Sequence, residues 1–130
     1  MDAGKLIGRG ISFPPRVGPD GRVQWSEGER NVREAIQVIL ATEPRERILL
    51  PEFGAGLSRF LFEPNTVTTR SQIAERITRA LGLWEPRISV ESVSVEADAQ
   101  DARAATATIT YKLVATGARE RLSLNITLAG

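Results

Sequence analysis

The sequence predicts an α+β fold, with two main helices packed on a three-stranded, or slightly larger, antiparallel meander and an irregular N-terminal arm. Two amphipathic helical patterns come first along the chain, and three alternating segments with short links follow. Short links favour antiparallel pairing, and the apolar face of such a sheet needs helices to cover it. A chain of 130 residues fits one domain, so we divide it into an arm, residues 1–25, and a single domain, residues 26–130.

The arm combines turn signals with apolar residues. The run Gly18-Pro19-Asp20-Gly21 is a strong turn signal. The apolar side chains that can dock on a core are Leu6, Ile7, Ile11, Phe13, Val23 and Trp25. We therefore expect the arm to lie on a neighbouring surface, either of its own chain or of a partner.

The first helix is expected at about 27–41. Ser26 and Glu29 match a capping box, and Pro44 follows the expected end. One apolar stripe is formed by Val32, Ala35, Ile36, Ile39 and Leu40. The opposite, solvent-facing side is assigned to Arg30, Arg33, Glu34 and Gln37.

A second helix is expected at about 69–82, after a short helical turn at 58–62. Thr69 and Gln72 suit a capping box, Gly82 suits the position after the helix, and Pro86 prevents its continuation. The buried stripe consists of Ile73, Ile77, Ala80 and Leu81.

The remaining chain predicts three strands. The apolar positions slip by one residue between Val90 and Val93, which favours a bulge in the first strand. The second strand alternates over 105–113 and the third over 122–128. In a sequential meander the third strand is an edge, yet residues 122–130 carry no charge and no proline.

Such an unguarded edge is a candidate for strand addition by a partner, because edge strands normally carry a charge or a bulge. The candidate interface residues are Leu122, Ser123, Leu124, Asn125, Ile126, Thr127 and Leu128. Two alternatives remain open: the strand inserts between others, or the arm covers it.

Composition excludes several classes of site. The chain has no cysteine and no histidine, which excludes disulfides, thiolate and imidazole metal ligands, and histidine-based catalysis. Its formal net charge of +1 does not favour capture of nucleic acid. No run approaches the roughly 18 apolar residues of a membrane span. We therefore expect no cofactor, metal, nucleic acid or membrane partner.

A carboxylate hydrolase is the enzyme class that this composition leaves open. Glu52, Glu63 and Glu85 lie in or beside segments rich in glycine and proline, where active-site residues often lie. Nothing in the spacing brings two of them together as a glycosidase requires. We predict that the chain is not an enzyme, and the alternative is a peptidoglycan hydrolase with Glu63 or Glu85 as the acid.

Trp84-Glu85-Pro86-Arg87 forms a corner between the second helix and the strands. Pro86 fixes its own φ angle and favours an extended Glu85. Glu85, Pro86 and Arg87 are therefore a candidate contact corner for a neighbouring chain. The alternative is an internal ion pair that holds the helix to the sheet.

Several segments, taken in order, resemble the baseplate wedge and sheath-initiator family of contractile tails. They are Gly8-Arg9-Gly10-Ile11, Ile39-Leu40-Ala41-Thr42, Glu46-Arg47, Pro51-Glu52-Phe53-Gly54, Leu61-Phe62-Glu63-Pro64-Asn65, and Leu83-Trp84-Glu85-Pro86-Arg87-Ile88. The family usually has glycine where this chain has Arg45, which puts the local turn in doubt.

The resemblance implies structural work in a phage tail or tail-like particle. Six copies would form a ring that partners template, and the chain would be assembled in the bacterial cytoplasm and remain in the baseplate. The implied partners are wedge proteins on one side and sheath subunits on the other, with the tail tube as a further candidate. In such systems sheath subunits donate terminal arms as strands, so the resemblance implies strand exchange at residues 122–128. It also implies that Glu85, Pro86 and Arg87 contact wedge proteins.

Overall fold

The computed structural model describes residues 11–13, 27–42 and 54–129. In chain order its elements are β1 (Ile11–Ser12), α2 (Glu27–Ala41), the 3-10 turn η1 (Leu57–Phe60), α3 (Val67–Trp84), β2 (Ile88–Ala97), β3 (Ala104–Leu113) and β4 (Arg119–Thr127). The predicted α+β fold is confirmed. The predicted capping pair at Ser26 and the unusual Arg45 lie outside the described residues.

The sheet has four antiparallel strands in the order β1-β4-β3-β2. The predicted meander is confirmed as β2, β3 and β4, and two residues of the arm add a short strand. The predicted bulge is also confirmed, because the pairing of β2 with β3 shifts between Val90 and Ser92. The β3–β4 hairpin turns at Gly117, whose φ of 75° suits glycine.

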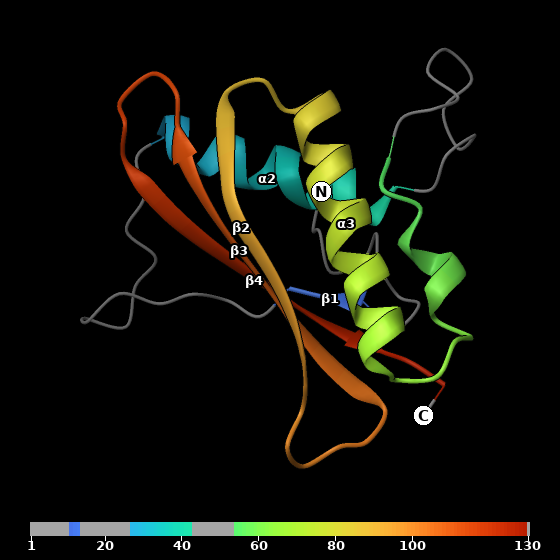
Figure 1. Cartoon of the computed structure of the whole chain (residues 1–130). Helices are drawn as coiled ribbons and strands as arrows, with labels where there is room; N and C mark the ends of the chain where they lie inside the picture. Colours follow the sequence, from blue (N-terminus) through green and yellow to red (C-terminus); the bar gives the residue numbers. More distant parts are fainter. Residues whose placement is uncertain (1–10, 14–26, 43–53, 130) are drawn as a thin grey trace.

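The core lies between the two helices and one face of the sheet. The alternate residues of β3 and β4 that were expected on the apolar face are buried, and Tyr111, Ile109 and Leu124 are 0% exposed. They form one cluster with Ile36 and Leu40 of α2 and with Ile73, Ile77 and Leu81 of α3. Figure 1 shows α3 running alongside β2, with α2 behind the sheet.

Helix α2 has the predicted bounds, but one of its side chains is not where the sequence placed it. Arg33, expected in solvent, is only 6% exposed. Its long side chain reaches Tyr111 of β3 and the backbone oxygen of Arg121 in β4, so its charged end finds hydrogen-bond partners inside the fold.

Helix α3 begins earlier and ends later than predicted. Thr66, not Thr69, is the N-cap, and its hydroxyl accepts a hydrogen bond from Thr69 N at 3.2 Å. Gly82 lies within the helix rather than after it, because Leu83 and Trp84 continue it and Glu85 caps it. The expected stop before Pro86 is confirmed, since a residue preceding proline disfavours helix.

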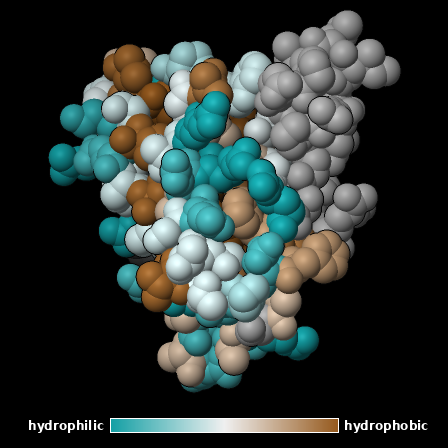
Figure 2. Space-filling model, turned by 45° about the vertical axis from the view of Figure 1, so that its right-hand side comes forward, coloured by the Kyte–Doolittle hydropathy of each residue, from teal (hydrophilic) through white to brown (hydrophobic). Residues whose placement is uncertain are grey.

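No helix among the described residues is long and apolar enough to cross a membrane. Figure 2 brings α3 forward and shows a hydrophilic band beside separate apolar patches.

Gly54 closes the connector onto the end of α2. Its φ is 113°, and a Cβ at this position would overlap the backbone carbonyl of Thr42. The next residue, Ala55, donates from its N–H to Ile39 O at 3.1 Å. Only glycine fits such a close approach of two backbone segments.

We expect Gly54→Ala to lower the free energy of unfolding by about 1–3 kcal/mol, because it adds both backbone strain and a clash. The matched control is Gly82→Ala, which adds a methyl group in open space inside α3. It should raise stability by about 0.5–1 kcal/mol. Urea denaturation measures both, and equal effects of the two substitutions would contradict this account of Gly54.

Candidate functional site

The outer edge of β4 is partly occupied by this chain's own residues. Two hydrogen bonds between the β3 and β4 sides show which backbone groups of β4 point inward. Leu128 N donates to Arg103 O at 2.6 Å, and Leu113 N donates to Ala118 O at 2.8 Å. Backbone groups alternate in direction along a strand, so the even-numbered residues of β4 face β3 and the odd-numbered ones face outward. At the outer side β1 pairs with Asn125 and Ile126.

The prediction that residues 122–128 form the edge of the sheet is therefore wrong, and the alternative that the arm covers this strand is confirmed at Asn125 and Ile126. Leu122, Leu124, Ile126 and Leu128 are core residues. The backbone groups that face outward belong to Ser123, Asn125 and Thr127. Whether these residues bind a partner is not tested by the structure and stays a prediction.

Arg33 occupies a second point on the same edge. Its Nη1 donates to the backbone oxygen of Arg121 at 2.9 Å, and Tyr111 Oη lies 3.5 Å from the same nitrogen. Burial raises the pKa of Tyr111, although the charge of Arg33 acts in the opposite direction. A guanidinium thus satisfies an outward-facing carbonyl that an added strand would otherwise use.

The corner after α3 is held by an internal ion pair. Arg87 Nε lies 2.7 Å from Glu85 Oε1, and Arg87 Nη2 donates to Glu85 Oε2 at 2.9 Å. Glu85 is 3% exposed, whereas the side chain of Arg87 is 52% exposed. The hydrogen bonds from Arg87 lower the pKa of Glu85 below its usual value, against the effect of burial.

The backbone joins this corner to both neighbouring elements. Glu85 N donates to Leu81 O at 3.0 Å, and Val114 N donates to Arg87 O at 2.9 Å. The alternative of an internal pair that holds helix to sheet is confirmed. A partner contact at Glu85, Pro86 and Arg87 stays a prediction, and it falls to the exposed Pro86 and Arg87 because Glu85 is buried.

A mainly apolar hollow of about 510 Å³ adjoins the corner. The start of α2, Pro86 and Arg87, and the β3–β4 hairpin line it, and Val32, Leu113 and Val114 are its main apolar side chains. Val114 is 64% exposed at its rim. Sequence reasoning missed this surface because its three walls lie far apart along the chain.

Phe62 is another exposed apolar residue, although the aromatic residues of this connector predict packing against the core. It is 88% exposed, although the segment around it is well anchored. Ala129 N donates to Glu63 O at 3.0 Å, and Asn65 Nδ2 donates to the carbonyls of Ala102 and Ala104. An exposed aromatic ring on an anchored turn is typical of a contact residue, since little freedom is lost on binding.

The two carboxylates of the hydrolase alternative lie far apart. Glu63 precedes α3 and Glu85 follows it, and a helix of 18 residues is about 27 Å long. A glycosidase needs its two carboxyl groups about 5 to 9.5 Å apart. The lowered pKa of Glu85 is also the opposite of what a general acid requires. Among the described residues no group of three acidic side chains is placed to hold a metal ion.

Comparison with known proteins identifies the family of this chain. The family model of the baseplate wedge protein gp25 matches residues 26–118. The chain belongs to this baseplate wedge family. The resemblance seen in the sequence is thereby confirmed, and membership places the chain among the wedge components of contractile injection machines.

Individual relatives support the same assignment. The baseplate wedge protein gp25 of Enterobacteria phage T4 is 31% identical over 85 residues, or 61% of this chain. The match spans 64% of that protein's length.

Two solved structures share the fold. A chain from the baseplate of the anti-feeding prophage is 32% identical, with a TM-score of 0.63 over 85% of this chain and 89% of that one. A putative tail lysozyme from Geobacter sulfurreducens is 31% identical, with a TM-score of 0.71 over 82% of this chain and 96% of that one.

The ion pair at the corner predicts a dependence of stability on pH. Because the folded state lowers the pKa of Glu85, the pair stabilises the fold above the usual value of 4.5 and loses its effect as the pH falls through the lowered value. We expect Glu85→Gln to lower the free energy of unfolding at pH 7 by about 1.5–3 kcal/mol. The variant should also lose stability less steeply than the wild type below pH 4.5.

The matched control is Glu91→Gln, which removes the surface pair of Glu91 with Arg119. It should cost about 1 kcal/mol or less. Urea denaturation at pH 7 and at several pH values below 4.5 measures both variants. Parallel pH profiles for Glu85→Gln and the wild type would contradict the role assigned to Glu85.

Proposed function

We propose that this chain is a structural subunit that joins the baseplate wedge to the first sheath ring and templates sheath assembly by accepting a strand from a sheath subunit. The observation that carries the proposal is a sheet of long antiparallel strands, of which β2 and β3 each have ten residues. A sheet offers backbone donors and acceptors at its edges, and a partner strand can pair with them.

The same proposal includes where the protein is assembled, how many copies each particle holds and what lies next to them. The chain is assembled in the bacterial cytoplasm and resides in the baseplate of a phage tail or tail-like particle. Six copies surround the tail tube, in a ring that the wedge proteins template. Family membership and the baseplate relative of similar fold support this arrangement.

The wedge side is assigned to the hollow and the corner beside it. The hollow is mainly apolar, and Arg87 adds a cation at its edge that the pair with Glu85 holds in place. A buried apolar anchor beside an oriented charge is a common form of interface centre. We assign this surface to wedge proteins and the strand-accepting edge to the sheath.

Deleting the gene from particle-producing cells should leave baseplates and tubes without attached sheath. Electron microscopy of purified particles measures this, and a plasmid copy of the wild-type gene is the control. Sheaths of normal number and length on the deletion particles would contradict the proposed function.

The wedge contact is tested by Val114→Glu, which places a charge at the rim of the hollow without disturbing the core. We expect the variant to fold normally but to enter baseplates about tenfold less well, because a charge is costly to bury at an apolar interface. The control is Leu83→Glu, since Leu83 is also 64% exposed but does not line the hollow. Quantitative mass spectrometry of purified particles measures incorporation, and equal incorporation of the two variants would contradict the assignment.

A peptidoglycan hydrolase is not favoured, although one relative of similar fold is a putative tail lysozyme. The separation of Glu63 and Glu85 along α3 leaves no acid and nucleophile pair between them.

A further inference from the structure

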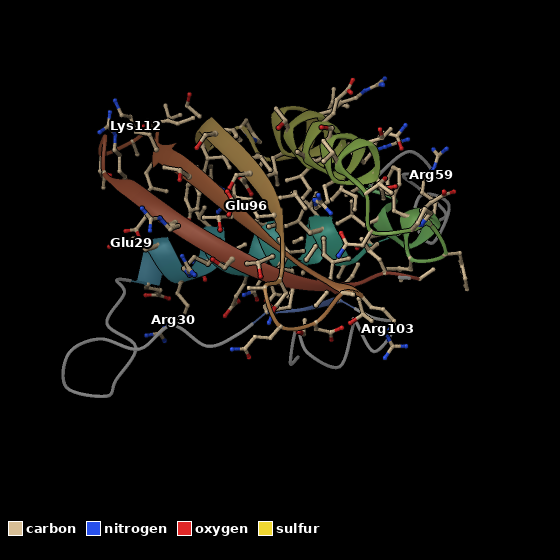
Figure 3. The ribbon with its side chains drawn as sticks, turned by 60° about the horizontal axis from the view of Figure 1, so that its bottom comes forward. Glu29, Arg30, Arg59, Glu96, Arg103 and Lys112 are labelled. Atoms are coloured by element: carbon tan, nitrogen blue, oxygen red, sulfur yellow. The ribbon has the colours of Figure 1, made fainter. Side chains whose placement is uncertain are left out.

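A small pocket between η1 and α3 is lined mainly by arginine, and its volume is about 220 Å³. We call it the arginine pocket, and its lining residues are Arg59, Phe60, Gln72, Glu75, Arg76 and Arg79. Figure 3 shows Arg59 beside α3, far from Glu29 and Arg30 at the start of α2. The arginine pocket is therefore separate from the apolar hollow, which Glu29 lines.

The helix and the short turn together explain why three arginines meet here. Gln72, Arg76 and Arg79 are spaced by four and then three residues, so they lie on one face of α3. The apolar stripe of the helix faces the core, which leaves this polar face at the surface. η1 contacts α3 and adds Arg59, whose guanidinium carbon lies 5.4 Å from the centroid of the Phe60 ring.

The positive charge of the arginine pocket is not balanced by the residues around it. The pocket holds three guanidinium groups but one carboxylate, that of Glu75. In the part of the chain that the structure describes, none of the three arginines forms an ion pair with a carboxylate. Arg59 and Arg79 are exposed and Arg76 is half-buried, so an approaching anion can reach their donors.

The chemistry and size of the pocket indicate what it binds. A guanidinium presents a planar fork of N–H donors that matches the two oxygens of a carboxylate, and clustered arginines commonly recognise acidic segments. Small-molecule sites usually have about 300–1,000 Å³, so a pocket of about 220 Å³ suits side chains better than a cofactor. Phe60, which is 6% exposed, forms an apolar floor and favours the observed position of Arg59 through a cation–π contact.

We infer that the arginine pocket binds an acidic segment of a neighbouring baseplate protein, whose carboxylates pair with Arg76 and Arg79. The occupant is a protein because the chain belongs to a family of baseplate wedge proteins, and a chain of similar fold comes from a baseplate. This contact goes beyond the proposed function, since it involves neither the apolar hollow nor a strand added to the sheet.

The spacing of the arginines limits the form of the acidic segment. Side chains three positions apart on a helix have Cβ atoms about 5–6 Å apart. The segment therefore presents two carboxylates at a similar spacing, which acidic residues three or four positions apart on a helix provide. Because the pocket is open to solvent, the contact weakens as the salt concentration rises.

Carbodiimide coupling in assembled particles tests whether a carboxylate occupies the pocket. Arg79→Lys keeps the charge and supplies an amine, which carbodiimide joins to a carboxylate in contact with it as an amide. Mass spectrometry of treated particles should find position 79 joined to an acidic segment of another baseplate protein. The matched control is Arg103→Lys, because Arg103 is exposed and lies outside the pocket, and it should not link to that segment.

Charge reversal measures how much the contact contributes. We expect Arg79→Glu to enter baseplates about tenfold less well than the wild type, because a repulsion replaces an attraction. Arg103→Glu makes the same change outside the pocket and should stay within about twofold of the wild type. Quantitative mass spectrometry of purified particles measures incorporation, and thermal denaturation checks that both variants fold.

The results that would overturn the inference are distinct from those that test the proposed function. No amide at position 79, or an amide only to a carboxylate of this same protein, overturns the acidic partner. Equal incorporation of Arg79→Glu and Arg103→Glu overturns it as well. Neither result changes the joining of wedge to sheath, which the gene deletion tests.

Discussion

A sheet leaves backbone donors and acceptors unpaired along its two outermost strands. The other features of this molecule depend on which of these groups the chain pairs with its own residues. On the β4 side the chain satisfies some of them with its own parts, two residues of β1 and the guanidinium of Arg33. On the β2 side α3 stands beside the edge and leaves a groove. Among the residues that the structure describes, the chain therefore occupies part of one side of the sheet itself and pairs no strand with the other.

The corner after α3 holds this region of the fold rigid, as a subunit of a large assembly requires. Glu85 caps the helix, pairs with Arg87 and is almost completely buried, while the backbone of Arg87 is joined to the start of the β3–β4 hairpin. Helix, strand and hairpin therefore meet at one ion pair. The exposed side of this corner lines the apolar hollow, so the surface assigned to wedge proteins has a fixed shape before any partner arrives.

Local patterns were sufficient for most of the fold. The apolar stripe of α2 predicted its bounds, and the slip between Val90 and Val93 predicted the bulge of β2, because both signals depend on neighbours within a few residues. The start of α3 was misjudged because Thr66 and Thr69 both suit a cap. The end was misjudged because glycine is tolerated inside a helix when the following residues continue it.

The sequence by itself determined the class of fold, the alternation that buries one face of β3 and β4, and the family, since all of these are written in periodicity and in ordered local segments. Only the tertiary structure decided which edge of the sheet the chain partly occupies itself, because Arg33 and the Arg121 carbonyl lie 88 positions apart. Only the tertiary structure brought three distant walls together into a hollow. Contacts between distant parts of a chain leave no periodic trace, so no pattern along the sequence could have assigned them.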